Sequence, residues 1–170
     1  NLHPSKPDWS AGLSKAWTPG ELGARKRLRD FLKTADGYAT GRDRPDEDQT
    51  SRLSPHLHFG EISPHQIWRA AVHAQEAGEA PARDIQKFLS EVAWRDFSHH
   101  LLYHDPQMGH LSWRRQFEEV DWRTGSKAEL EAWKRGQTGY PIVDAGMRQL
   151  WATGFMHNRV RMIVASFFAK

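Results

Sequence analysis

Three short segments carry the signature of a helix start, and they constrain the fold of this chain more than any other feature. In each, a serine or threonine precedes a glutamate or glutamine by three residues: Thr18-Pro19-Gly20-Glu21, Ser63-Pro64-His65-Gln66 and Ser126-Lys127-Ala128-Glu129. Such a pair can cap a helix N-terminus reciprocally, and proline at the first helical position strengthens the signal in the first two segments. No stretch shows the sustained alternation of apolar and polar residues that is typical of a half-buried strand. The sequence therefore predicts an all-α fold.

Glycine and proline residues predict where several helices begin and end. Three glycines are predicted helix ends: Gly78, Gly136 and Gly154. Pro141 is predicted to begin another helix. The segment from Gly41 to Gln49 is rich in Asp, Arg and Pro, and it is predicted to be a polar loop.

The chain is interpreted as one helical domain with a short arm in front of it. Residues 1–17 show no periodicity and are expected to form a linker or an extended arm, so the domain is predicted to span residues 18–170. Phe167 and Phe168 continue a helix that reaches Lys170 without a capping residue. The chain is therefore expected to be a fragment that is cut within a helix.

Composition excludes several classes of function. The absence of cysteine excludes disulfides and thiolate chemistry. The apolar runs are far shorter than a membrane span and no leader opens the chain, so a soluble, cytoplasmic protein without a membrane partner is expected. The formal charge of +3 and several groups of arginines permit a polyanionic partner. Eight tryptophans suit core packing, but also stacking on bases or on a ring-shaped cofactor.

Two distant segments are predicted to be helices that each have a core face and a polar face. In residues 91–98, a sector of about 100° holds the polar and aromatic side chains of Glu91, Trp94, Arg95 and Ser98. In residues 155–162, Asn158 and Met162 lie one turn apart and share a face. Both faces are candidate functional surfaces.

The segment Thr50-Ser51-Arg52-Leu53-Ser54-Pro55 places three hydroxyls and a guanidinium within five residues. Hydroxyl and backbone N–H groups at a turn that enters a helix suit phosphate oxygens. Serine and threonine beside proline are also common in ordinary turns, so these residues alone leave both interpretations open.

A metal site is a weaker alternative. His100 and His104 lie one helical turn apart, with His99, Asp105 and His110 close by. No carboxylate or cysteine completes a recognisable ligand pattern, so exposed or capping histidines and no metal are expected.

Five linked motifs give the chain a specific resemblance. They are Tyr38-Ala-Thr-Gly-Arg42-Asp-Arg-Pro45, Thr50-Ser-Arg-Leu-Ser54, Glu91-Val-Ala-Trp94-Arg95, Thr138-Gly-Tyr-Pro-Ile-Val-Asp144-Ala-Gly-Met-Arg148-Gln-Leu150 and His157-Asn158-Arg159. In this order and spacing, the chain from Thr18 onward closely resembles the flavin-binding domain of the photolyase and cryptochrome family. The resemblance implies an all-helical domain that holds FAD beside a cavity for damaged bases flipped from DNA.

Single residues indicate a branch of that family. The pair His157-Asn158 resembles the class I photolyases, which repair cyclobutane pyrimidine dimers; (6-4) photolyases carry a second histidine at the Asn158 position, and plant cryptochromes typically an aspartate. Trp94 also argues against a plant cryptochrome, because these proteins lack tryptophan at that position. Phe155 stands where similar proteins commonly have tryptophan and is interpreted as a tolerated exchange. DASH cryptochromes, which favour single-stranded DNA, remain an alternative.

The resemblance implies a role for each matching residue. The residues implied to hold FAD are Tyr38, Thr50, Ser51, Arg52, Leu53, Ser54 and Arg95, the last as the cation that faces its phosphates. Those implied to line the cavity for the pyrimidine dimer are Glu91, Trp94, Asn158 and Met162. Arg42, Arg159 and Arg161 are implied to contact the DNA backbone, which holds register without reading sequence. Trp122 resembles the exposed end of the family's tryptophan electron relay.

The implied activity is light-driven repair of pyrimidine dimers in DNA. In this family, excited reduced FAD passes an electron to the dimer, the ring splits and the electron returns. A protonated Glu91 or the amide of Asn158 would donate hydrogen bonds to the dimer and stabilise its transient negative charge, and partial burial beside Trp94 is expected to keep Glu91 protonated. The alternative is a blue-light sensor of the cryptochrome kind, which binds the flavin without repairing DNA.

Only part of such a protein is expected in this chain. Family members begin with an α/β antenna domain that binds a second chromophore, and they continue past the equivalent of residue 170 with further flavin contacts. The chain is therefore expected to fold as a helical bundle, to bind FAD weakly or not at all, and to be inactive alone. Apolar surface meant for absent helices is expected to favour self-association.

Overall fold

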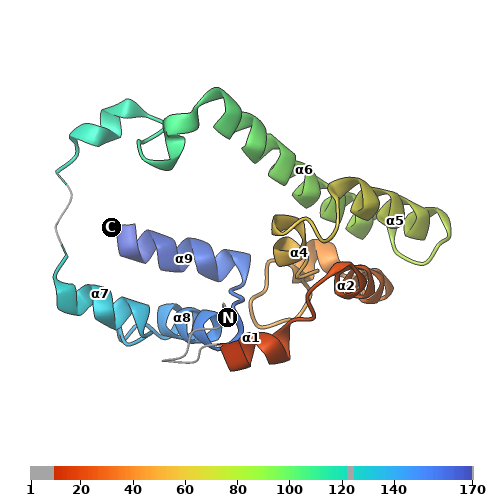
Figure 1. The fold of residues 1–170 in the computed structure, drawn as a ribbon, viewed down its shortest axis with the longest axis horizontal. Coiled ribbons are helices and arrows are strands. Elements are labelled where there is room, and N and C mark those ends of the chain that lie inside the picture. The colour runs from red at the N-terminus through yellow and green to blue at the C-terminus, as the bar shows by residue number, and fades with distance from the viewer. Residues whose placement is uncertain (1–9, 122–124, 170) are drawn as a thin grey trace.

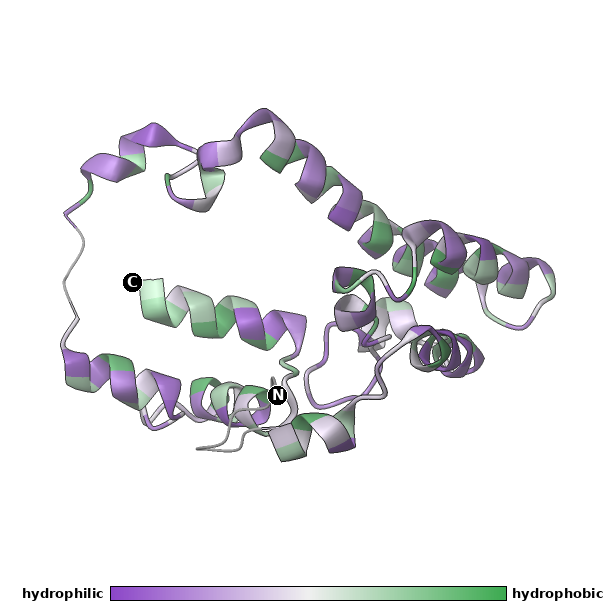
Figure 2. Ribbon diagram, in the orientation of Figure 1, coloured by the Kyte–Doolittle hydropathy of each residue, from purple (hydrophilic) through white to green (hydrophobic). Residues whose placement is uncertain are grey.

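The computed structural model describes residues 10–121 and 125–169 (Figure 1). Within these ranges the regular elements are helices without exception, which confirms the predicted all-α class. None of the helices in these ranges is long and apolar enough to cross a membrane. Figure 2 shows hydrophobic and hydrophilic residues on the same long helices, as is typical of helices with one buried face.

Eleven helical segments follow one another in the described part of the chain. They are α1 (Ser10–Ala16), α2 (Glu21–Lys33), α3 (Tyr38–Gly41), α4 (Ser54–His58), α5 (Pro64–Glu76), α6 (Ala82–His104), the 3₁₀ segments η1 (Pro106–Gly109) and η2 (Arg115–Glu119), α7 (Lys127–Lys134), α8 (Pro141–Thr153) and α9 (Asn158–Ala169). The irregular stretch after α3 confirms the predicted polar loop.

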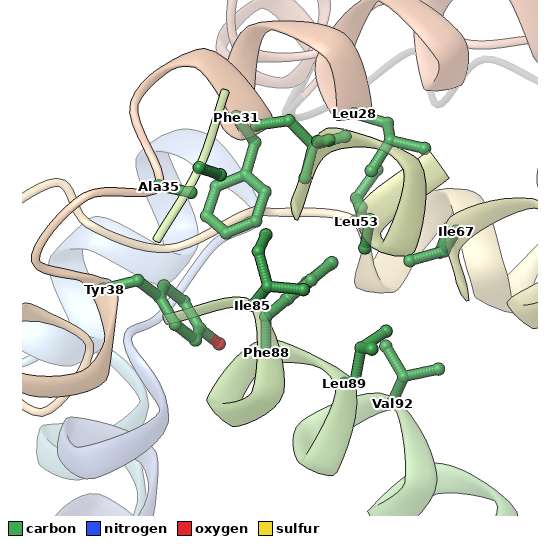
Figure 3. Close-up of a cluster of buried hydrophobic side chains, with 14 of the residues drawn as sticks. Leu28, Phe31, Ala35, Tyr38, Leu53, Ile67, Ile85, Phe88, Leu89 and Val92 are labelled. Atoms are coloured by element: carbon green, nitrogen blue, oxygen red, sulfur yellow. The ribbon is translucent and has the colours of Figure 1, made fainter. Parts of the chain in front are cut away.

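The larger of two hydrophobic cores lies among α2, α3, α5 and α6 (Figure 3). Ile67 and Ile85 are fully buried at its centre. The rings of Phe31, Tyr38 and Phe88 pack against one another, with centroids 4.7 to 5.7 Å apart. This core fixes α6 against the segments that precede it.

The smaller core lies between α8 and α9, where the buried side chains are Val143, Met147, Met156, Val160 and Val164. The two helices approach closely at Gly146, because a Cβ atom there would lie only 2.5 Å from Cγ1 of Val160. This contact sets the position of α9 and hence of the residues at its start.

Two of the three predicted capping boxes are present. The hydroxyls of Ser63 and Ser126 each accept a hydrogen bond from the backbone N–H three residues later. The side chains of Gln66 and Glu129 in turn accept a hydrogen bond from the backbone N–H of the capping serine. Pro141 begins α8 and Gly154 ends it in the left-handed region at φ 70°, and Gly78 and Gly136 follow α5 and α7 in the same conformation. Local sequence therefore determines these helix boundaries.

The third predicted box is wrong. Helix α2 begins after Gly20, whose φ of 92° suits glycine, and the side chain of Thr18 makes no cap. The N–H of Gly20 instead donates to Oε1 of Glu61 at 2.7 Å. A carboxylate distant in sequence therefore replaces the local cap.

The expectation of a linker is wrong for residues 10–16, which form α1. Gly12 lies so close to the carbonyl of Ala152 that a Cβ atom there would overlap that oxygen. Trp17 follows α1, and its Nε1 donates to the carbonyl of Thr153 at 2.6 Å. Packing against α8, rather than periodicity over two turns, explains this helix. Residues 1–9 lie outside the described part.

Candidate functional site

A cavity of about 590 Å³ lies where residues of the larger core meet the start of α9. The first wall comes from α3 and from the segment that leads into α4, and the second from Glu91, Arg95 and His99, which follow one another at single turns of α6. The third wall comes from residues at and before the start of α9, among them Phe155, Asn158 and Arg161.

All seven residues predicted to hold the cofactor line this one cavity: Tyr38, Thr50, Ser51, Arg52, Leu53, Ser54 and Arg95. Glu91, Asn158, Arg42 and Arg161 lie in the same walls. The structure thus brings together residues that are up to 123 positions apart in the chain, from Tyr38 to Arg161.

The backbone of the segment with three hydroxyls takes an uncommon form at Arg52. Its φ of 52° is left-handed, a region that costs a non-glycine residue free energy and is found preferentially at functional sites. Nη2 of Arg52 lies 2.8 Å from Oδ1 of Asp48, and the guanidinium stacks 4.7 Å from the ring centroid of Phe155. Its Nε is buried without a hydrogen-bond partner among the described residues. This donor is therefore available to an acceptor brought by a ligand.

The cavity carries more positive than negative charge. Four guanidinium groups line it, those of Arg42, Arg52, Arg95 and Arg161, against the single carboxylate of Glu91. Nη1 of Arg42 lies 2.7 Å from Oε1 of Glu91. In the described ranges, Arg95 and Arg161 pair with no carboxylate. The two free cations and the three hydroxyls favour an anionic ligand.

Glu91 lies between two cationic side chains at the wall of the cavity. Its Oε1 lies 2.7 Å from Arg42 and 2.9 Å from Nζ of Lys87. The expected role of Glu91 as a hydrogen-bond donor to the dimer stays a prediction.

Tyr38 is the most buried hydroxyl of the site, with 5% of its surface exposed. Burial raises the pKa of Tyr38 to about 12, although the positive charge of Arg42 acts in the opposite direction. The phenol is therefore neutral at physiological pH, and it is held in place by Phe31 and Phe88.

Trp94 and Met162 do not line the cavity. They are 58% and 57% exposed, and the ring of Trp94 packs edge-on against Phe97. The predicted polar sector of α6 is thus split, since Glu91 and Arg95 face the cavity while Trp94 points elsewhere. The angular position of a residue on a helix can be calculated from the sequence, but whether another element covers that residue cannot.

The predicted helix over residues 155–162 begins later than expected, at Asn158. The ring of His157 just before it is buried, and its Nδ1 accepts a hydrogen bond from the N–H of Arg159 at 3.2 Å. Burial lowers the pKa of His157, which favours the neutral ring that this bond requires. His157 thereby stabilises the start of α9.

The three arginines expected at a DNA backbone have different environments. Arg42 is 8% exposed and paired with Glu91, so the expectation of a surface contact is wrong for it. Arg159 is partly exposed and donates to Oδ1 of Asp43 from Nε at 3.1 Å and from Nη2 at 2.8 Å. Arg161 is exposed at the cavity edge.

Sequence reasoning missed the roles of Phe155 and Asp43. Phe155 supports the guanidinium of Arg52, and Asp43 joins the loop after α3 to α9 through Arg159. The motif around Arg42 contained Asp43, but nothing in it indicated the partner. The predicted relay residue Trp122 lies outside the described residues. His100 and His104 pack their rings 4.4 Å apart, and the described residues contain no group of three metal-binding side chains.

Comparison with known proteins extends these observations. A family model described as the FAD binding domain of DNA photolyase matches residues 88–170. The chain is 52% identical over 170 residues to a deoxyribodipyrimidine photo-lyase of Agrobacterium fabrum, which covers 99% of this chain and 35% of that protein. The chain belongs to the DNA photolyase and cryptochrome family. It spans about a third of the length of the curated photolyases that it matches.

One solved structure and one cryptochrome relative show which branches of the family are similar to this chain. The structure of a bacterial class III photolyase from Agrobacterium tumefaciens is 51% identical, with a TM-score of 0.92 over 99% of this chain and 34% of that one. Class III is therefore an alternative to the expected class I, because this similar protein is described as a class III photolyase. Cryptochrome-1 of Arabidopsis thaliana is 36% identical over 173 residues, which cover 95% of this chain and 24% of that protein.

Proposed function

We propose that the cavity binds FAD and that the whole protein uses it to repair cyclobutane pyrimidine dimers in DNA under light. The observation that carries this proposal is the convergence of all seven predicted FAD residues on one positively charged cavity. Its volume of about 590 Å³ lies within the range of about 300 to 1,000 Å³ that is usual for small-molecule sites.

The segment from Thr50 to Ser54, together with Arg95, is the proposed site for the FAD diphosphate. The hydroxyls donate to phosphate oxygens, and the unpaired guanidinium of Arg95 neutralises charge. The buried Nε of Arg52 would gain the acceptor that it lacks. Tyr38 donates as a neutral phenol and keeps water from the inner wall.

Bound reduced FAD supplies the electron for dimer cleavage when it absorbs light. The chain's own contribution is to bind and orient the dimer at the mouth of the cavity. The amide of Asn158 donates a hydrogen bond to a dimer carbonyl, where negative charge develops. Glu91 accepts a hydrogen bond from a dimer N–H, while Arg42 and Lys87 hold its side chain in place. Exposed Trp94 and Met162 offer apolar contacts outside the cavity, and Arg159 and Arg161 contact the DNA backbone.

FAD binding is tested by titrating the purified chain in the dark and following the quenching of flavin fluorescence. Arg95→Ala is expected to weaken binding by about 10- to 100-fold, since a hydrogen bond to a charged group contributes about 1.5 to 3 kcal/mol. Arg83→Ala is the matched control, because Arg83 is an exposed arginine on the same helix outside the cavity. Equal affinities for the two variants would contradict the proposed site. If the chain alone binds no FAD, as its partial length predicts, the same comparison is made in the whole protein.

The sensor alternative has support from the cryptochrome relatives, and a repair assay separates the two. Blue light should remove a thymine dimer from an oligonucleotide when the FAD-loaded whole protein is present. Glu91→Ala should slow repair and spare FAD binding. A protein that binds FAD and leaves the dimer intact would be a sensor, and the repair proposal would be rejected.

A further inference from the structure

A second groove, of about 630 Å³, lies between α2 and α5 and shares no residue with the cavity described above. One wall is formed by Arg25, Arg29 and Lys33 of α2. The other is formed by Arg69 and His73 of α5, and Glu79 is the single acidic residue of the lining. The groove is therefore basic on both sides.

The basic side chains are regularly spaced. The three on α2 follow one another at four-residue intervals, so they form a row along one face with a rise of about 6 Å per step. Arg69 and His73 are one turn apart on the opposite wall. A ligand that follows the groove thus meets positive charge repeatedly on each side.

Most of this charge is unpaired. In the described part of the chain, Arg29, Lys33 and Arg69 have no carboxylate within ion-pair distance. Nη2 of Arg25 lies 3.5 Å from Glu21, but both side chains are well exposed, and such pairs contribute little. The groove can therefore neutralise an anionic ligand without first breaking strong internal pairs.

The floor of the groove argues for a polyanion rather than a protein segment. Leu28, Leu32, Ile62 and Ala74 are already buried, with 3 to 9% of their surfaces exposed. Little apolar area is left to form the hydrophobic centre of a protein interface. Phosphate groups need only charge and polar donors, and the amide of Gln66 adds one such donor to the arginines.

We propose that the groove between α2 and α5 is a second contact surface for the phosphate backbone of DNA, indifferent to base sequence and to damage. This inference rests on the proposed function only because it takes DNA as the partner. Such a surface raises affinity for undamaged DNA, where the cavity has no dimer to bind, and it makes that affinity strongly dependent on salt.

The test is the salt dependence of binding to an undamaged 20-base-pair duplex, measured by fluorescence anisotropy between 50 and 200 mM NaCl. In Arg29→Gln/Arg69→Gln, the slope of log K against log salt should fall in magnitude by about 1.8, and affinity at 0.1 M salt by about 60-fold. The control is Lys134→Gln/Arg135→Gln, which removes the same charge from two exposed residues at the end of α7. The control should keep the slope of the unchanged chain.

Equal losses in the two variants would show an effect of net charge and overturn the groove as a site, and so would an unchanged slope in the groove variant. Poly-glutamate of equal charge that binds through the same arginines more tightly than the duplex would assign the groove to an acidic protein segment instead. The residues changed in both variants lie outside the FAD cavity, so a negative result here leaves the proposed FAD site standing. The Arg95→Ala titration tests only the FAD site, so its result does not bear on the groove.

Discussion

Replacing Gly146 with alanine tests whether the packing of α8 on α9 positions the cavity. Gly146 is buried in α8, and a Cβ atom there would lie 2.5 Å from Cγ1 of Val160 and 3.2 Å from Cγ2 of Val164. Carbon atoms pack best about 3.5 to 4.0 Å apart, so the first contact is too short by about 1 Å. Valine side chains in a helix have one strongly preferred rotamer and cannot turn away. The strain must therefore be relieved by movement of α9.

Two opposing effects set the magnitude. Overpacking a core costs about 1 to 3 kcal/mol, whereas alanine in a helix interior is about 1 kcal/mol more favourable than glycine. The net loss of unfolding free energy is therefore about 1 kcal/mol, or about 2 to 4 °C in Tm for a chain of this size. Because Asn158 and Arg161 stand near the start of α9 and line the cavity, FAD affinity should fall as well.

Thermal and urea unfolding, followed by far-UV circular dichroism, measure the stability, and the FAD titration measures the cavity. Gly109→Ala is the control, since a Cβ atom there would meet nothing within 4 Å. It should leave both quantities nearly unchanged. A Gly146→Ala chain that is more stable than the original by about the full helix-propensity gain would refute the reasoning, because it would mean that α9 yields without cost.

Four further outcomes are expected. Ile85→Ala should lower the unfolding free energy by about 3 kcal/mol and Ile85→Val by about 1, since Ile85 is fully buried; equal values in urea denaturation would contradict the packing of the larger core. Ser63→Ala should cost about 1 kcal/mol through loss of the capping box, and a thermal melt that does not change would count against it. The hydroxyl of Thr138, then its backbone N–H and that of Gly139, lower the pKa of Asp144 from its ordinary value of 3.8. The carboxylate thus stabilises the fold above that value, and the stability is lost as pH falls through the lowered pKa. Asp144→Asn should accordingly be less stable than the original chain at pH 7 and lose less on acidification, as parallel pH titrations of Tm will show. Exposed apolar side chains on α9 should make the chain self-associate, and sedimentation that stays monomeric as concentration rises would exclude this.

Much of the fold was predictable because its signals are local. The capping boxes at Ser63 and Ser126 close within three residues, so the sequence predicts them without knowledge of the rest of the chain. The same holds for Pro141 and Gly154, which act through their own backbone preferences. At Gly20 the local pattern failed, since Glu61 reaches the helix start from 41 residues away and removes the need for Thr18.

The candidate site divides in the same way. The motifs identified the residues around Thr50 to Ser54 and those on α6, and the structure places them in one cavity. Their ion pairs and exposure could not be predicted, because these depend on partners brought close by folding. Arg42 is buried beside Glu91, which is 49 residues further along the chain and lies 2.7 Å away.

The sequence by itself determined that this chain is helical, where several helices begin and end, and which family it belongs to, since each of these follows from residue types at short spacing. Tertiary structure alone decided that residues 10–16 are a helix, that Trp94 and Met162 lie outside the cavity, and that Arg52 takes a left-handed backbone over Phe155. The physical reason is the separation along the chain of the residues that interact. Hydrogen bonds within a turn are set by neighbours in the chain, whereas burial and ion pairing depend on which distant side chains the two cores bring into contact.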